Sequence, residues 1–104
     1  MRPTGGDRYR SIRDVEVRGL SRFRNPSSGG FKATLPRGEI VTVKRDPPPQ
    51  AKAVYALPER YEDLEQLLVP PEDLASKAYD GYSLVIRFEE LDRDFEFLGR
   101  RGAA

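Results

Sequence analysis

The sequence predicts a mainly β fold, in which a small, strongly bent antiparallel sheet closes into a barrel. Five or six short segments alternate apolar with polar residues, which is the period of a strand with one buried face. Turn signals containing Gly, Pro or Asn separate most of these segments. Only the stretch after Pro58 carries the spacing of an amphipathic helix. A chain of 104 residues suits one domain with one hydrophobic core.

The N-terminal part is predicted to hold an arm and a first strand. Residues 1–11 are polar and rich in glycine, so we expect a flexible N-terminal arm. The folded domain then spans residues 12–98. Its first strand has Val15 and Val17 on one face, and we expect Gly19 to end it.

Residues 31–45 are predicted to form an exposed β-hairpin. A loop of Asn, Pro, Ser and Gly over residues 25–30 precedes the first strand, residues 31–35. Leu35-Pro36-Arg37-Gly38 has Pro at the second and Gly at the fourth turn position, which suits a type I turn. The β-branched residues of 39–44 then form the returning strand.

Residues 58–77 are predicted to form a helical insertion between two strands. The strand before the insertion, residues 52–57, has one face formed by Ala53, Tyr55 and Leu57. Pro58 suits the start of a helix, whose apolar side is formed at steps of three and four by Tyr61, Leu64, Leu67 and Leu68. Pro70-Pro71 ends this one short α-helix, and residues 71–75 are compatible with a further one-turn piece.

The C-terminal part is predicted to form two strands joined by a single 3-10 turn. Asp80-Gly81 is a turn dipeptide. The strand behind it has one face formed by Tyr82, Leu84, Ile86 and Phe88. Residues 89–93 are too few for a full helix and fit a 3-10 turn before the last strand. That strand, residues 94–98, sets Phe95 and Phe97 on one face, and residues 99–104 form a tail.

Two pieces of the chain, residues 35–43 and 82–98, resemble an SH3-like barrel in their order of turn, strand, single helical turn and short final strand. Eukaryotic SH3 signalling domains hold proline-rich ligands against a Trp and an acidic loop. This sequence has no Trp, so we do not expect that mode of peptide binding. Its own Pro47-Pro48-Pro49 is followed by Gln50 and does not meet the PxxP spacing of an SH3 ligand.

Residues 37–43, followed by Asp46-Pro47, resemble the opening of the growth-inhibitor toxin family of small-barrel ribonucleases. In that family a Gly-Asp/Glu-Ile-Val strand precedes an Asp-Pro loop. The match covers about ten residues, so no catalytic residue is carried over from it. It implies RNA as a ligand at the level of the fold alone.

The composition excludes several classes of chemistry. With neither Cys nor His, the chain has no disulfide, no thiolate nucleophile and no imidazole for metal binding or acid-base catalysis. We expect no cofactor and no metal, and the sequence favours a non-enzymatic protein, although a carboxylate-based hydrolase or nuclease stays open. No apolar run could span a bilayer and the start lacks a signal-peptide pattern, so we expect a cytoplasmic protein. Many prolines and few thermolabile side chains predict a thermophile source.

The charges are sorted along the chain. Residues 1–45 contain eleven Lys or Arg and four Asp or Glu, whereas residues 46–99 contain five and thirteen. Such asymmetry suggests a polyanionic partner. The candidate contacts for an anion or a nucleic acid are Arg8, Arg10, Arg13, Arg18, Arg22 and Arg24, which are interleaved with Tyr9 and Phe23. Alternatively, these arginines pair with the acids of the second half in the fold.

The sequence predicts a small bacterial-type β-barrel protein that binds a protein partner or a second copy of itself. The insertion 58–77 and the hairpin 31–45 are the expected recognition surfaces, with Tyr61, Tyr79 and Phe31 as candidate interface residues. The alternative is RNA or DNA binding by the Arg-rich N-terminal half.

Overall fold

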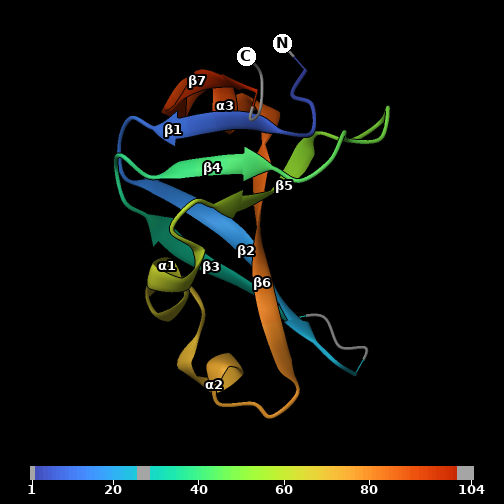
Figure 1. Ribbon diagram of the computed structural model, residues 1–104, viewed down its shortest axis with the longest axis vertical. Helices are drawn as coiled ribbons and strands as arrows, with labels where there is room; N and C mark the ends of the chain where they lie inside the picture. Colours follow the sequence, from blue (N-terminus) through green and yellow to red (C-terminus); the bar gives the residue numbers. More distant parts are fainter. Residues whose placement is uncertain (1, 26–28, 101–104) are drawn as a thin grey trace.

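The protein is a mainly β structure of seven antiparallel strands in one sheet with three short helices (Figure 1). The computed structural model describes residues 2–25 and 29–100. The strands are β1 (Asp7–Ser11), β2 (Val15–Phe23), β3 (Gly29–Leu35), β4 (Ile40–Val43), β5 (Ala53–Pro58), β6 (Tyr79–Arg87) and β7 (Phe95–Arg100). The helices are α1 (Tyr61–Leu68), α2 (Pro71–Leu74) and α3 (Phe88–Asp94). The mainly β, antiparallel prediction is confirmed.

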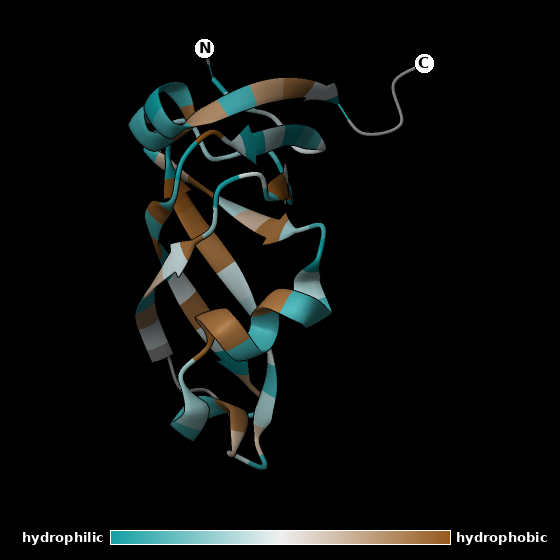
Figure 2. Ribbon diagram, turned by 90° about the vertical axis from the view of Figure 1, so that its left-hand side faces the viewer, coloured by the Kyte–Doolittle hydropathy of each residue, from teal (hydrophilic) through white to brown (hydrophobic). Residues whose placement is uncertain are grey.

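The strands follow the order β3-β2-β6-β5-β4-β1-β7. This order leaves β3 and β7 as the two edges, so the predicted closure into an SH3-like barrel is not confirmed. The sheet bends around a core that α1 also covers, with the largest fully buried side chains being Tyr82, Leu35, Leu84, Ile86, Val17, Val41 and Val43. Figure 2 shows hydrophobic residues concentrated on the strands in the middle of the molecule.

Residues 7–11 form a strand, where the sequence predicted the end of a flexible arm. Asp7–Ser11 form β1, which pairs with β4 on one side and with β7 on the other. Tyr9 is only 5% exposed and its ring centroid lies 5.4 Å from that of Phe97. The alternation of apolar and polar residues does not reveal this strand, because two of its three inward-facing residues are polar. The hydroxyl of Ser11 donates to the carbonyl of Pro36 at 2.7 Å, which removes the cost of burying it.

Gly19 does not end β2, which continues to Phe23 between β3 and β6. Gly19 lies directly opposite Phe31, and a Cβ on Gly19 would lie 2.2 Å from the Phe31 ring. Gly19 therefore does not end the strand. Its missing side chain leaves space for an aromatic ring.

The predicted hairpin of residues 31–45 is wrong. β3 pairs with β2, whereas β4 pairs with β1 and β5. The turn between them redirects the chain across the molecule, since Gly38 donates its N–H to the carbonyl of Ser11 at 2.9 Å and Arg37 donates its N–H to Asp14 at 2.9 Å. Turn residues show that the chain bends, but not which strand it then joins.

Two further predictions around β6 are corrected. Asp80-Gly81 is not a turn between strands but lies inside β6, where the pairing with β2 shifts register. Where the sequence predicted a single 3-10 turn, the structure has a seven-residue α-helix, α3. Its start is stabilised by the carboxylate of Glu90, which accepts the N–H of Arg87 at 3.0 Å. The insertion holds the predicted helix α1 and, where residues 71–75 were compatible with a further one-turn piece, the four-residue helix α2.

Candidate anion-binding surface

One row of side chains crosses the sheet on the side opposite the core. Arg18 of β2 lies opposite Lys32 of β3 on one side and opposite Val85 of β6 on the other. Val85 lies opposite Tyr55 of β5, and Lys44, directly after β4, donates its N–H to the carbonyl of Tyr55 at 2.9 Å. Directly paired residues of neighbouring strands point to the same side of a sheet. The row therefore runs Lys32, Arg18, Val85, Tyr55, Lys44.

Further cations surround this row. The pKa of Lys44 is lowered. Burial is the largest cause, and the nearby positive charges of Arg22 and Arg45 add to it. The guanidinium carbon of Arg45 lies 5.9 Å from the centre of the Tyr55 ring, a cation–π distance. We call the surface formed by Arg18, Arg22, Lys32, Lys44 and Arg45 around Tyr55 and Val85 the basic face.

None of the five cations of the basic face forms an ion pair with any acid in the described part of the chain. Like charges gathered without partners repel each other, and a bound anion relieves that repulsion. Three acids, Glu16, Glu90 and Asp46, line pockets on this face. Of these, Glu90 is held by Arg87, and Asp46 accepts the N–H of Gly5 at 2.7 Å. Glu16 lines a pocket together with Arg18.

The structure divides the arginines that the sequence singled out. Arg8, Arg10 and Arg13 pair with Glu59, Glu96 and Asp94 at 3.1, 2.5 and 3.6 Å, respectively. For these three the alternative prediction, pairing with the acidic half, is the observed one. Arg18 and Arg22 lie on the basic face. Arg24 follows the end of β2, where its N–H bonds the carbonyl of Ala78.

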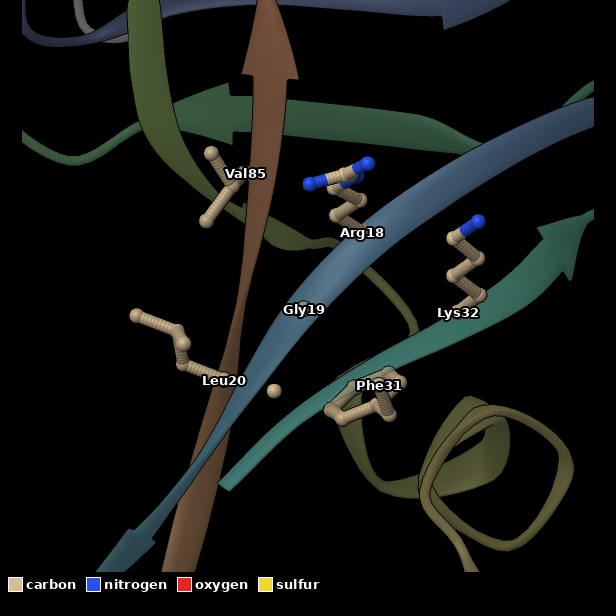
Figure 3. A pocket seen from close by; sticks show the side chains of 7 residues that line it. Arg18, Gly19, Leu20, Phe31, Lys32 and Val85 are labelled. Atoms are coloured by element: carbon tan, nitrogen blue, oxygen red, sulfur yellow. The ribbon is translucent and has the colours of Figure 1, made fainter. Parts of the chain in front are cut away.

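The basic face is hollowed. Three shallow pockets of about 480, 400 and 340 Å³ adjoin at Val85, which lines all of them. The largest lies over the backbone of β2 and β3 and is lined by Arg18, Gly19, Leu20, Gly30, Phe31, Lys32 and Val85 (Figure 3). Gly30 leaves this surface open because it has no side chain. The smallest lies beside Tyr55, between β5 and the Pro-rich segment after β4.

The three predicted protein-interface residues are not free surface groups. Phe31 is buried over Gly19 and only 8% exposed. The Tyr61 hydroxyl accepts the N–H of Tyr82 at 2.8 Å, and the two rings stack 4.3 Å apart. Tyr79 donates to Glu65 at 2.7 Å. Their polar ends therefore serve the fold.

Sequence reasoning missed Tyr55, whose side chain is 41% exposed on the outer side of β5. The buried residues of this strand are instead Val54, Ala56 and Pro58. Both alternating sets in β5 are apolar, so alternation does not indicate which set faces the core. In the sequence, this surface is indicated by two adjacent cations, Lys44 and Arg45, which directly follow the β-branched residues of β4.

No group of three acidic side chains that could hold a metal ion occurs within residues 2–25 and 29–100. In the same residues, no helix has the length and apolarity to cross a membrane. Comparison of the chain with protein-family models, with curated proteins and with solved structures finds no match.

Proposed function

We propose that this protein binds RNA or DNA on the basic face. The observation that supports the proposal is the gathering of five cations without acidic partners, among the described residues, around an exposed tyrosine on one side of the sheet. Phosphate contacts by Lys and Arg supply most of the affinity of non-specific nucleic-acid binding, and aromatic rings add stacking.

The spacing of the cations suits a phosphodiester chain. Neighbouring strands lie about 4.8 Å apart, so Lys44 lies three strands, or about 14 Å, from Arg18. The apolar Val85 and the ring of Tyr55 lie between these two charges. A nucleic-acid strand running across the β-strands would thus find phosphate partners at both ends and an aromatic surface in the middle.

Salt dependence tests the phosphate contacts. For single strands, the logarithm of the association constant falls by about 0.7 per phosphate contact for each tenfold rise in salt. Five contacts predict a loss of about 100-fold between about 50 and 200 mM salt, measured by fluorescence polarisation of a labelled oligonucleotide. Binding to anionic phospholipid vesicles without binding to any oligonucleotide would contradict the proposal.

A matched pair of double variants separates the basic face from charge in general. Arg18→Ala with Lys32→Ala removes two unpaired cations and is expected to weaken binding about 25-fold at about 0.1 M salt. Arg8→Ala with Arg10→Ala removes the same charge, but from arginines already paired with Glu59 and Glu96. We expect less than about a threefold loss for this control. Equal losses would mean that only net charge matters.

The predicted contact with a protein partner or a second copy of the chain is the second candidate function. It is supported by the edge strand β7, which pairs only with β1 in the described residues and carries Phe97, 48% exposed. Light scattering after size exclusion tests self-association, and Phe97→Glu is expected to abolish it. A strict monomer that captures no protein would count against this candidate.

We also propose that the bent sheet is a variant of the SH3-like barrel. The helix α3 directly before the final strand supports this, as does the strong bend of the sheet around one core. Closure would require contact between β3 and β7, which nuclear Overhauser effects between their backbone protons would detect.

A further inference from the structure

We propose that the nucleic acid bound on the basic face is single-stranded, with one unpaired base seated against the ring of Tyr55 in the pocket between β5 and the segment 46–51. This inference rests on the proposed function and adds to it the class of ligand and the position of a base.

The pocket beside Tyr55 has the size and lining for a base. Its volume is about 340 Å³. Tyr55 and Val85 offer apolar surface, and two cations, Arg45 and Lys52, also line it. Base–aromatic stacking tolerates any base because every base has a π-face, and a nearby Arg adds a cation–π contribution.

The far wall of this pocket is held in place by bonds to other parts of the chain. The guanidinium of Arg2 donates to the carbonyls of Pro47 and Pro48, and its carbon lies 5.3 Å from the centre of the Phe88 ring. The N–H of Ala51 bonds the carbonyl of Pro48 at 3.0 Å, which closes a turn. Three consecutive prolines add stiffness because their φ angles are fixed. The wall is therefore formed before any ligand binds, which lowers the entropic cost of binding.

The shape of the basic face favours a single strand over a duplex. Readout of duplex DNA uses a helix or a β-ribbon that protrudes into a groove. Here the cations surround pockets that recede from the surface, so an aromatic contact forms only if a base leaves its own stack and enters the protein. An unpaired strand meets this condition without the cost of unpairing.

Three probes of the same strand length test the inference on the whole 104-residue chain, and the duplex among them carries twice as many phosphates as either single strand. They are an oligothymidylate of about 12 nucleotides, an abasic chain of equal length and a duplex of oligothymidylate with oligoadenylate. We expect the oligothymidylate to bind at least about fivefold more tightly than the abasic chain. Tyr55→Ala is expected to remove this ratio and to leave the salt dependence unchanged, whereas Tyr55→Phe keeps the ratio.

The absence of tryptophan from the sequence allows a direct readout. Tyr55→Trp introduces a single indole, whose emission a stacked base quenches. Phe97→Trp places the same reporter at another exposed aromatic position, on β7, and its emission is expected not to change. Both variants are expected to keep the wild-type affinity to within about threefold.

The outcomes separate the two proposals. If no probe binds, the proposed function itself fails. If the abasic chain and the duplex bind at least as tightly as the oligothymidylate and the emission of the Tyr55→Trp variant is unaffected, phosphate binding stands and the single-strand inference is overturned. Preference for the single strand, with quenching in the Tyr55→Trp variant alone, supports both.

Discussion

At the scale of single residues, Gly81 and Tyr61 show how the irregular part of β6 is held in place. Gly81 has φ +103°, in the region that side chains other than glycine rarely adopt, and a Cβ there would lie 2.6 Å from the Tyr61 hydroxyl oxygen. This close approach lets Tyr61 accept the N–H of Tyr82, while the Tyr82 hydroxyl donates to the Tyr61 carbonyl at 2.7 Å. The missing side chain thus permits two hydrogen bonds between α1 and β6.

Replacing this glycine is expected to be costly. Gly81→Ala combines backbone strain of about 1–2 kcal/mol with a clash against Tyr61, so we expect a loss of about 3 kcal/mol in the free energy of unfolding. Gly38→Ala is the control, since Gly38 also has positive φ, +89°, but a Cβ there meets nothing within 4 Å. It should lose only about 1–2 kcal/mol. Urea unfolding measures both, and equal losses would contradict the role of Tyr61.

Three buried or half-buried tyrosines predict a loss of stability at alkaline pH. Burial, followed by the hydrogen bond and the charge of Glu65, raises the pKa of Tyr79 above its ordinary value of 10.0. Burial is also the largest cause that raises the pKa values of Tyr82 and Tyr9. In the unfolded chain these phenols ionise near pH 10, so their contribution to stability is complete below about pH 10 and is lost as the pH rises further.

Absorbance of tyrosinate and urea unfolding together test this expectation. Between about pH 9 and pH 11 the free energy of unfolding should fall, and the absorbance at the tyrosinate band should rise in step with unfolding. Tyr79→Phe should weaken the pH dependence, because phenylalanine cannot ionise. Early ionisation of all tyrosines in a protein that stays folded would contradict it.

At the scale of elements, α1 shows that only one side of a short helix is used. Leu64 and Leu68 are buried against the sheet, whereas Leu67, on the same helix, is 59% exposed. An eight-residue helix is too short to be stable by itself, so its packed side determines whether it forms.

Two leucine substitutions in α1 are expected to differ sharply. Leu64→Ala should cost about 2–5 kcal/mol because it leaves a cavity in the core. Leu67→Ala, the matched control, should change stability by less than about 0.5 kcal/mol. Thermal and urea unfolding would measure both, and a large loss at Leu67 would show that this side of α1 is covered in solution.

At the scale of the whole molecule, β1 ties the two ends of the chain together. It is the strand that joins β7 to the rest of the sheet. The ion pairs of Arg8, Arg10 and Arg13 with the acidic half accompany this pairing. The Arg8 and Arg10 pairs are exposed and contribute about 0–1 kcal/mol each, so the strand pairing carries most of the stabilisation.

A chain that lacks residues 1–11 is therefore expected not to fold. Its β7 would have no partner strand and the side of the core under Tyr9 would be open. Far-ultraviolet dichroism and the dispersion of amide proton signals would show the loss. The control Arg10→Ala keeps the strand and should cost less than about 1 kcal/mol. A folded deletion variant would support the flexible arm that composition predicted.

The sequence by itself determined the local structure of this protein. Alternation identified the segments around Val15, Phe31, Ile40 and Leu84 as strands, and spacing identified α1, because a strand or helix with one buried face has its period written into neighbouring residues. Composition likewise excluded Cys and His chemistry. In β1 this logic failed, because its buried Asp7 and Ser11 are polar. Asp7 accepts the N–H of Thr4 and Ser11 donates to the carbonyl of Pro36, so both are buried without breaking the fold.

Only the tertiary structure decided which strands pair and which cations stay unpaired. The partner of β3 and the outward side of β5 depend on contacts between residues far apart in the chain, which no local period encodes. The same pairing neutralises Arg8, Arg10 and Arg13 and assembles Arg18, Lys32 and Lys44 into one row beside Tyr55. A charge acts through its neighbours in space, and those neighbours are set by the fold.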